Sequence, residues 1–248
     1  MKQNDKPSAL PTHGIFDRKN RPKLVMVSVT AVLIVASYIL FHQDFPRDFI
    51  EILPLFVSLV ISLMQTEANR YAFLLGGINS IFYAAVYFSF GIYASAVYAL
   101  AASFPLQIWT FIRWSKHAYG KSTVFKKLSK KHLILLITTV VAAFTICYVV
   151  FDALGSRYLV LDNATTVLGT LTAVLCAFAF VDYVYFNLFS QVVSVAMYIQ
   201  MMLDTPVRAP YLIYAVFALI CLILTTIRVH QLYRFQQEEQ KRKSTADE

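Results

Sequence analysis

Eight long stretches that are almost free of charged residues set the strongest limit on what this chain can fold into. A membrane-crossing helix needs about 20 mostly apolar residues, and the runs are continuous rather than alternating, which disfavours membrane strands. The sequence therefore predicts an all-α integral membrane protein with eight transmembrane helices. The predicted helices span residues 23–42, 50–66, 71–90, 92–113, 132–151, 163–181, 184–203 and 209–230.

The positive charge is sorted by side. The chain has 22 Lys and Arg against 14 Asp and Glu, although only 15% of its residues are charged. If the N-terminus is cytoplasmic, the inner segments hold 19 of these basic residues, and the outer loops hold only Arg47, Arg157 and Arg208. This is the positive-inside pattern, so we expect both termini in the cytoplasm of a plasma (inner) membrane protein. The excess of basic residues therefore reflects membrane topology rather than nucleic-acid binding, because a nucleic-acid binder would spread its basic residues over a folded surface.

The centres of the predicted helices contain no Asp, Glu, Lys, Arg or His. Such groups usually mark proton relays and ion sites in membranes, and a metalloprotease would need the sequence His-Glu-x-x-His. The nearest carboxylate, Asp182, falls at a helix end. We therefore expect no enzyme, no metal, no cofactor and no ion coupling.

Neutral polar and aromatic residues occupy the helices instead. Two predicted helices each carry an amide and tyrosine face: Asn79, Tyr83 and Tyr87 on one, and Gln191, Ser194 and Tyr198 on the other. Amides donate and accept hydrogen bonds, and tyrosine adds a flat ring, so these faces favour a ring-bearing solute with hydroxyls. Amides can equally tie membrane helices together. Ser194 can be a small packing residue, and Trp114 an interfacial anchor.

The two faces suggest an internal repeat. Each lies on the second helix of a three-helix unit, and a single helix separates the units, which gives a parallel 3+1+3 plan with one extra N-terminal helix. The C-terminal tail is expected to extend the last helix into solvent. The predicted divisions are a basic N-terminal tail (1–22), the extra helix (23–42), the first unit (50–114), a basic cytoplasmic loop (115–131), the linker helix (132–151), the second unit (163–232) and the C-terminal tail (233–248).

The sequence resembles the PnuC family of vitamin transporters over about residues 50–232. The likeness rests on Gly76-Gly77-Ile78-Asn79-Ser80-Ile-Phe-Tyr83, Gly91-Ile-Tyr93, Gln107-x-x-Thr110-Phe111-x-x-Trp114 and Gln191-x-x-Ser194-x-x-x-Tyr198. Members that carry nicotinamide riboside typically have Gly-Trp-x-x-Trp after the glutamine, and Asn where Gln191 aligns. Asn187 offers a second register for that position.

The resemblance implies a fold like that of the SWEET sugar carriers and uptake of nicotinamide riboside by facilitated diffusion, with trapping by a cytosolic kinase. Thiamine, riboflavin and deoxynucleosides remain alternative cargoes, and the oligomeric state stays open, although related folds are often multimeric. A non-transporting receptor or scaffold that acts through its basic loop is the alternative from another class. The expected substrate-binding residues are Asn79, Tyr83, Tyr87, Gln107, Phe111, Trp114, Asn187, Gln191, Ser194 and Tyr198.

Overall fold

The computed structural model describes residues 21–42 and 47–246. Within these residues, eight helical segments are long and apolar enough to cross a membrane, which confirms the predicted number. One segment is composite, because α4 and α5 are joined by the π-helix η2. The segments are α1 (Arg21–Phe41), α2 (Arg47–Gln65), α3 (Tyr71–Ser89), α4 (Tyr93–Val97) with η2 (Tyr98–Ser103) and α5 (Phe104–Lys116), α6 (Lys130–Ala153), α7 (Leu159–Ala177), α8 (Tyr183–Asp204) and α9 (Ala209–Ala246).

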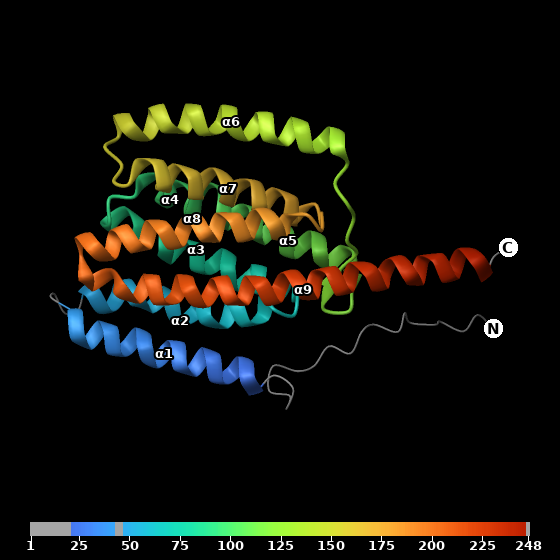
Figure 1. Ribbon diagram of the computed structural model, residues 1–248, viewed down its shortest axis with the longest axis horizontal. Coiled ribbons are helices and arrows are strands. Elements are labelled where there is room, and N and C mark those ends of the chain that lie inside the picture. The colour runs from blue at the N-terminus through green and yellow to red at the C-terminus, as the bar shows by residue number, and fades with distance from the viewer. Residues whose placement is uncertain (1–20, 43–46, 247–248) are drawn as a thin grey trace.

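Two helices differ most from the sequence prediction at their ends. α7 begins at Leu159 rather than at residue 163, so Asp162 lies inside the helix instead of in a loop. α9 continues to Ala246, well beyond residue 230. This extension confirms that the C-terminal segment prolongs the last helix, and Figure 1 shows it projecting from the bundle.

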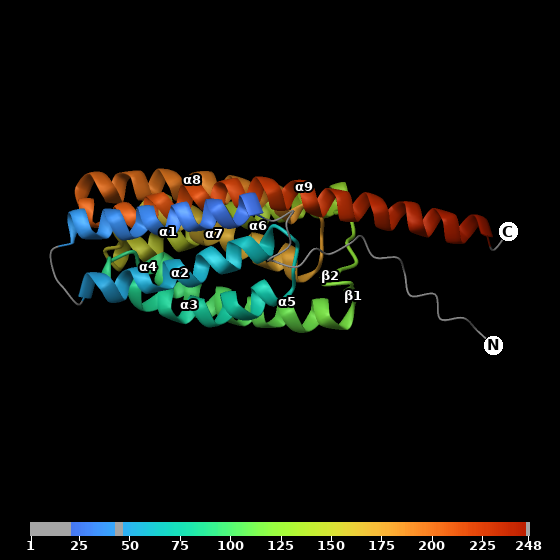
Figure 2. The same ribbon diagram turned by 90° about the horizontal axis from the view of Figure 1, so that it is seen from below.

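The helices lie side by side in one elongated bundle (Figures 1 and 2). α6 forms one edge and packs on α7 and α4, while α1 forms the other edge and packs on α9 and α2. Its contacts with α7 and α4 leave most of α6 uncovered by protein, as expected for an apolar helix whose surroundings are lipid. The hydrogen bonds of its backbone are satisfied within the helix, which an apolar medium requires.

One end of the bundle, here called the basic end, carries the turn 66–70, the segment 117–129 and the projecting part of α9. A short hairpin of β1 (Ala118–Tyr119) and β2 (Ser122–Thr123) lies in this segment. The side chain of Gln236 fixes it to α9, since its Oε1 accepts from the Phe125 amide at 2.9 Å and its Nε2 donates to the Thr123 carbonyl at 2.9 Å. The basic segment is thus folded against the helices.

The other end, here called the opposite end, contains a fully buried carboxylate. Asp162 of α7 is 0% exposed and accepts from the backbone amides of Ala94 and Ser95 at 3.0 and 2.9 Å. The hydroxyls of Ser95 and Ser156 also donate to it. Asp162 therefore caps the first turn of α4, where a negative charge is favoured. The carboxylate joins α7 to α4, and four donors compensate its burial.

Candidate functional site

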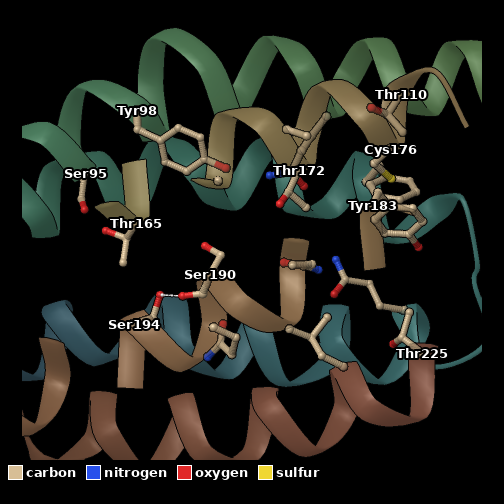
Figure 3. Close-up of a pocket in the computed structure, with 18 of the residues that line it drawn as sticks. Ser95, Tyr98, Thr110, Thr165, Thr172, Cys176, Tyr183, Ser190, Ser194 and Thr225 are labelled. Carbon is tan, nitrogen blue, oxygen red and sulfur yellow. Dashed lines mark hydrogen bonds between the residues drawn. The ribbon is translucent and has the colours of Figure 1, made fainter. Parts of the chain in front are cut away.

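A cavity of about 260 Å³ lies in the interior of the bundle. Its walls come from the end of α2, the turn 66–70, α3, the composite α4–η2–α5, α7, α8 and α9. Figure 3 shows side chains from these elements facing one another across the space. Small-molecule pockets typically measure about 300–1,000 Å³, so the cavity has the scale of a small solute.

Most of the side chains that the sequence predicts for the site line this cavity. The structure brings together Tyr87, Gln107, Trp114, Asn187, Gln191, Ser194 and Tyr198. Asn187 and Gln191 are one helical turn apart on α8, so both registers of the second amide position reach the same space. Asn79, Tyr83 and Phe111 are not among the lining residues.

Asn79 and Tyr83 face α2 rather than the cavity. The Asn79 amide nitrogen donates to the Pro54 carbonyl at 3.1 Å and to the Ser58 hydroxyl at 2.8 Å, and the Tyr83 hydroxyl lies 2.9 Å from the same Ser58 oxygen. The reason is that residues spaced i, i+4 and i+8 do not stay on one line along a helix. Each residue advances by about 100°, so residues i and i+8 differ by about 80° around the helix. The predicted stripe therefore begins against α2 at Asn79 and reaches the cavity only at Tyr87.

Phe111 lies on the neighbouring side of α5, where its ring packs 5.6 Å from that of Tyr71. The side chain of Trp114 is fully buried, and its indole nitrogen donates to the Cys176 carbonyl at 2.9 Å. The rings of Phe73 and Phe125 flank it at 4.7 and 5.5 Å. Trp114 thus links α5 to α7 at the basic end of the cavity, so it is buried in protein rather than anchored at a lipid interface.

Gln107 is held by serines of the first unit. Its amide nitrogen donates to the hydroxyls of Ser103 at 2.7 Å and Ser80 at 3.1 Å, and these two hydroxyls lie 2.8 Å apart. Gly76 leaves the space that the amide of Gln107 occupies, because any Cβ at this position would collide with its oxygen. The motif Gly76-Gly77 and the Gln107 motif are therefore parts of one contact between α3 and α5.

Among the described residues, the amide side chains on the α8 wall of the cavity make fewer hydrogen bonds than the Gln107 amide does. Gln191 donates from Nε2 to the Ala215 carbonyl of α9 at 3.0 Å, and the Ser194 hydroxyl donates to the Ser190 carbonyl at 3.0 Å. Among the described residues, no hydrogen bond engages the side chain of Asn187. Towards the opposite end, the hydroxyls of Tyr198 and Tyr87 lie 3.0 Å apart. This pair connects α8 to α3 beside the cavity.

These features match a known protein family. A family model described as the nicotinamide mononucleotide transporter matches residues 48–227. The chain belongs to the nicotinamide mononucleotide transporter family. Its fold is similar to the crystal structure of the vitamin B3 transporter PnuC, with a TM-score of 0.72 at 19% identity over 86% of this chain and 91% of that one. A comparison with curated protein sequences gave no match.

Membership of this family makes the protein a multi-pass membrane transporter rather than an enzyme. None of the described residues that line the cavity is Asp, Glu, Lys, Arg or His. The cavity lining instead offers hydroxyls, amides and aromatic rings. The described residues also contain no cluster of three or more His, Cys, Asp or Glu that could hold a metal ion.

The structure adds lining residues that the sequence reasoning missed. Tyr98 stands at the start of η2, and the π-helical turn breaks the 3.6-residue period on which face predictions depend. Its ring occupies space left by Gly169, where a Cβ would lie only 2.9 Å from the Tyr98 Cζ. Thr165, Thr172 and Cys176 of α7 form the same wall. Their spacing of i, i+7 and i+11 places them on one helical face, and this pattern was readable in the sequence.

Proposed function

We propose that the protein is a facilitator for nicotinamide riboside or a closely related vitamin or nucleoside. The observation that carries the proposal is the uncharged, amide-rich and aromatic cavity in the middle of a transporter-family fold. Stacking of a base-like ring on an aromatic side chain contributes about 1–3 kcal/mol, and Tyr98 and Tyr198 offer such rings. Gln107, Asn187 and Gln191 would bond the carboxamide and the ribose hydroxyls.

The cavity favours the riboside over the mononucleotide. A phosphate group needs Lys, Arg or a metal ion to offset its desolvation, and none of the described lining residues is basic. The positive pyridinium of the riboside is less demanding, because aromatic faces attract cations. The same surroundings accept thiamine, riboflavin or a deoxynucleoside, which we keep as alternative cargoes within the family.

We further propose that transport is uncoupled and that a cytosolic kinase traps the cargo. The buried carboxylate of Asp162, which contacts the lining residue Ser95, is already engaged by four donors. In this scheme the basic end faces the cytoplasm, which follows from the positive-inside pattern. The two three-helix units would be related as a parallel 3+1+3 repeat, with the site at their interface and α1 as the extra helix.

Purified protein in proteoliposomes tests the proposal. We expect uptake of labelled nicotinamide riboside down its gradient, without acceleration by a proton or sodium gradient, and little uptake of the mononucleotide. Thiamine, riboflavin and deoxynucleosides form the comparison panel, and thermal stabilisation by each solute reports binding independently. Folded protein that carries none of these solutes, or that prefers the mononucleotide, would contradict the proposal.

A further inference from the structure

The hydroxyl of Thr172 is a polar group on the cavity wall that lacks a partner within the described part of the chain. Thr172 is 8% exposed, and its Oγ1 makes no hydrogen bond there. Most threonines in these helices bond backwards to a carbonyl of their own helix, and Thr166 is the other described exception on α7. Thr110 of the same cavity donates to the Leu106 carbonyl at 2.6 Å, and Thr225 donates to the Cys221 carbonyl at 2.8 Å. Buried polar atoms are normally paired, so an exception on a cavity wall calls for a ligand.

The neighbours of Thr172 point to the kind of ligand group. Figure 3 shows its side chain between Tyr98 and Tyr183, facing into the open space. Gly169, three residues earlier, leaves room for the Tyr98 ring, and Cys176, four residues later, lies against Tyr183. The Thr172 hydroxyl therefore lies in a stretch of the cavity wall that is otherwise formed by aromatic rings and small residues. A flat heterocycle against these rings would direct its polar substituent at Thr172.

From this arrangement we infer that Thr172 is a specificity-determining residue whose hydroxyl hydrogen-bonds one hydroxyl of the sugar part of the transported solute. The inference rests on the proposed function, because it deepens the choice among ring-bearing solutes at the same site. A threonine hydroxyl both donates and accepts, which matches the chemistry of a sugar hydroxyl. Solutes that lack this hydroxyl would leave Thr172 unpaired, and sites built in this way discriminate strongly against them.

The same helix supplies a matched control. Thr166 is also 8% exposed, and its Oγ1 also lacks a partner among the described residues, but Thr166 does not line the cavity. The substitutions Thr172→Val and Thr166→Val are nearly isosteric, and each removes one buried, unpaired hydroxyl from α7. General effects on folding should therefore be similar in the two variants, whereas only Thr172→Val should change ligand binding.

The experiment measures dissociation constants for nicotinamide riboside and for its 2′-, 3′- and 5′-deoxy analogues. We expect Thr172→Val to weaken riboside binding about tenfold, Thr166→Val to leave it unchanged, and Thr172→Ser to retain it. One deoxy analogue should bind the wild type and Thr172→Val equally, which identifies the contacting hydroxyl. Thr172→Ala provides a second reading if the valine variant folds poorly.

Three outcomes would overturn the inference. Riboside binding that is unchanged in Thr172→Val, while the wild type binds well, removes the contact and leaves the proposed function intact. Equal losses for the riboside and all three analogues indicate a packing effect. A wild type that binds neither the riboside nor any analogue removes the proposed function for this solute, and the inference falls with it.

Discussion

The polar faces of α3 and α8 have similar residues and opposite surroundings. On α3, the amide of Asn79 and the hydroxyl of Tyr83 are turned to α2 and bonded to Pro54 and Ser58. On α8, Asn187 and Gln191 line the cavity, and the Asn187 side chain has no hydrogen bond to any described residue. One face therefore holds helices together, and the other is available to a solute.

The difference shows that an amide in a membrane helix takes its role from what faces it. α2 presents the Ser58 hydroxyl to Asn79, so the amide donors are used within the protein, as is common between membrane helices. The face of α8 meets the cavity because α7 and α9 pack on its other sides. Among the residues predicted for the site, Tyr87 of α3 and Gln107 of α5 do line the cavity.

The largest effect on binding is expected at Asn187. Replacing it with alanine removes amide groups that would bond the solute, and we predict an affinity loss of about tenfold or more. The thermal unfolding midpoint should change little, because the side chain makes no hydrogen bond with the described protein. Titration with nicotinamide riboside checks the first part and a melting curve the second. If the variant bound the riboside as tightly as the wild type, the solute would make its polar contacts with other residues than Asn187.

The reverse pattern is expected at Asn79. Alanine there removes two donated hydrogen bonds in a buried helix contact, which should lower the free energy of unfolding by about 1–3 kcal/mol. The dissociation constant of the folded protein should stay close to that of the wild type. A double-mutant cycle with Ser58→Ala separates this contact from general packing. A large loss of riboside affinity at unchanged stability would indicate that Asn79 contacts the solute and would contradict this prediction.

The two faces are joined by a hydrogen bond between the hydroxyls of Tyr87 and Tyr198. Tyr87→Phe and Tyr198→Phe should each cost about 1 kcal/mol of stability, and the double variant should cost less than their sum because the bond is shared. Since both rings stay in the wall, stacking with a solute should persist. Chemical unfolding of the four proteins measures the coupling, and strict additivity would show that the bond does not contribute.

The sequence predicted the fold better than the site. Helix number follows from apolar length, which the bilayer enforces, and so all eight helices were readable. Site faces depend on where each helix meets its neighbours. The periodicity that found Gln191, Ser194 and Tyr198 also selected Asn79 and Tyr83, because the pattern cannot show that α2 covers them. Tyr98 was not predicted as a lining residue because η2 breaks the helical period. Thr172 was not predicted as a lining residue because the hydroxyl of a threonine in an apolar helix normally hydrogen-bonds to the backbone of its own helix.

The smallest effect is expected far from both faces, at the basic end. There the Tyr119 hydroxyl donates to the Glu239 carboxylate of the α9 extension at 2.8 Å. Burial, together with this hydrogen bond, raises the pKa of Tyr119 to about 12. An unfolded tyrosine titrates near pH 10, so the contribution of the hydroxyl to stability is complete below about pH 10 and is lost as the pH rises through about 12.

Tyr119→Phe should therefore lower the free energy of unfolding by about 1 kcal/mol or less, by an amount that stays constant between pH 7 and pH 9. Riboside affinity should not change, because the contact lies outside the cavity wall. Melting curves of both proteins across this pH range provide the measurement. If affinity fell together with stability, the basic end would be coupled to the α8 face, and the separation between structural and solute-facing contacts would have to be redrawn.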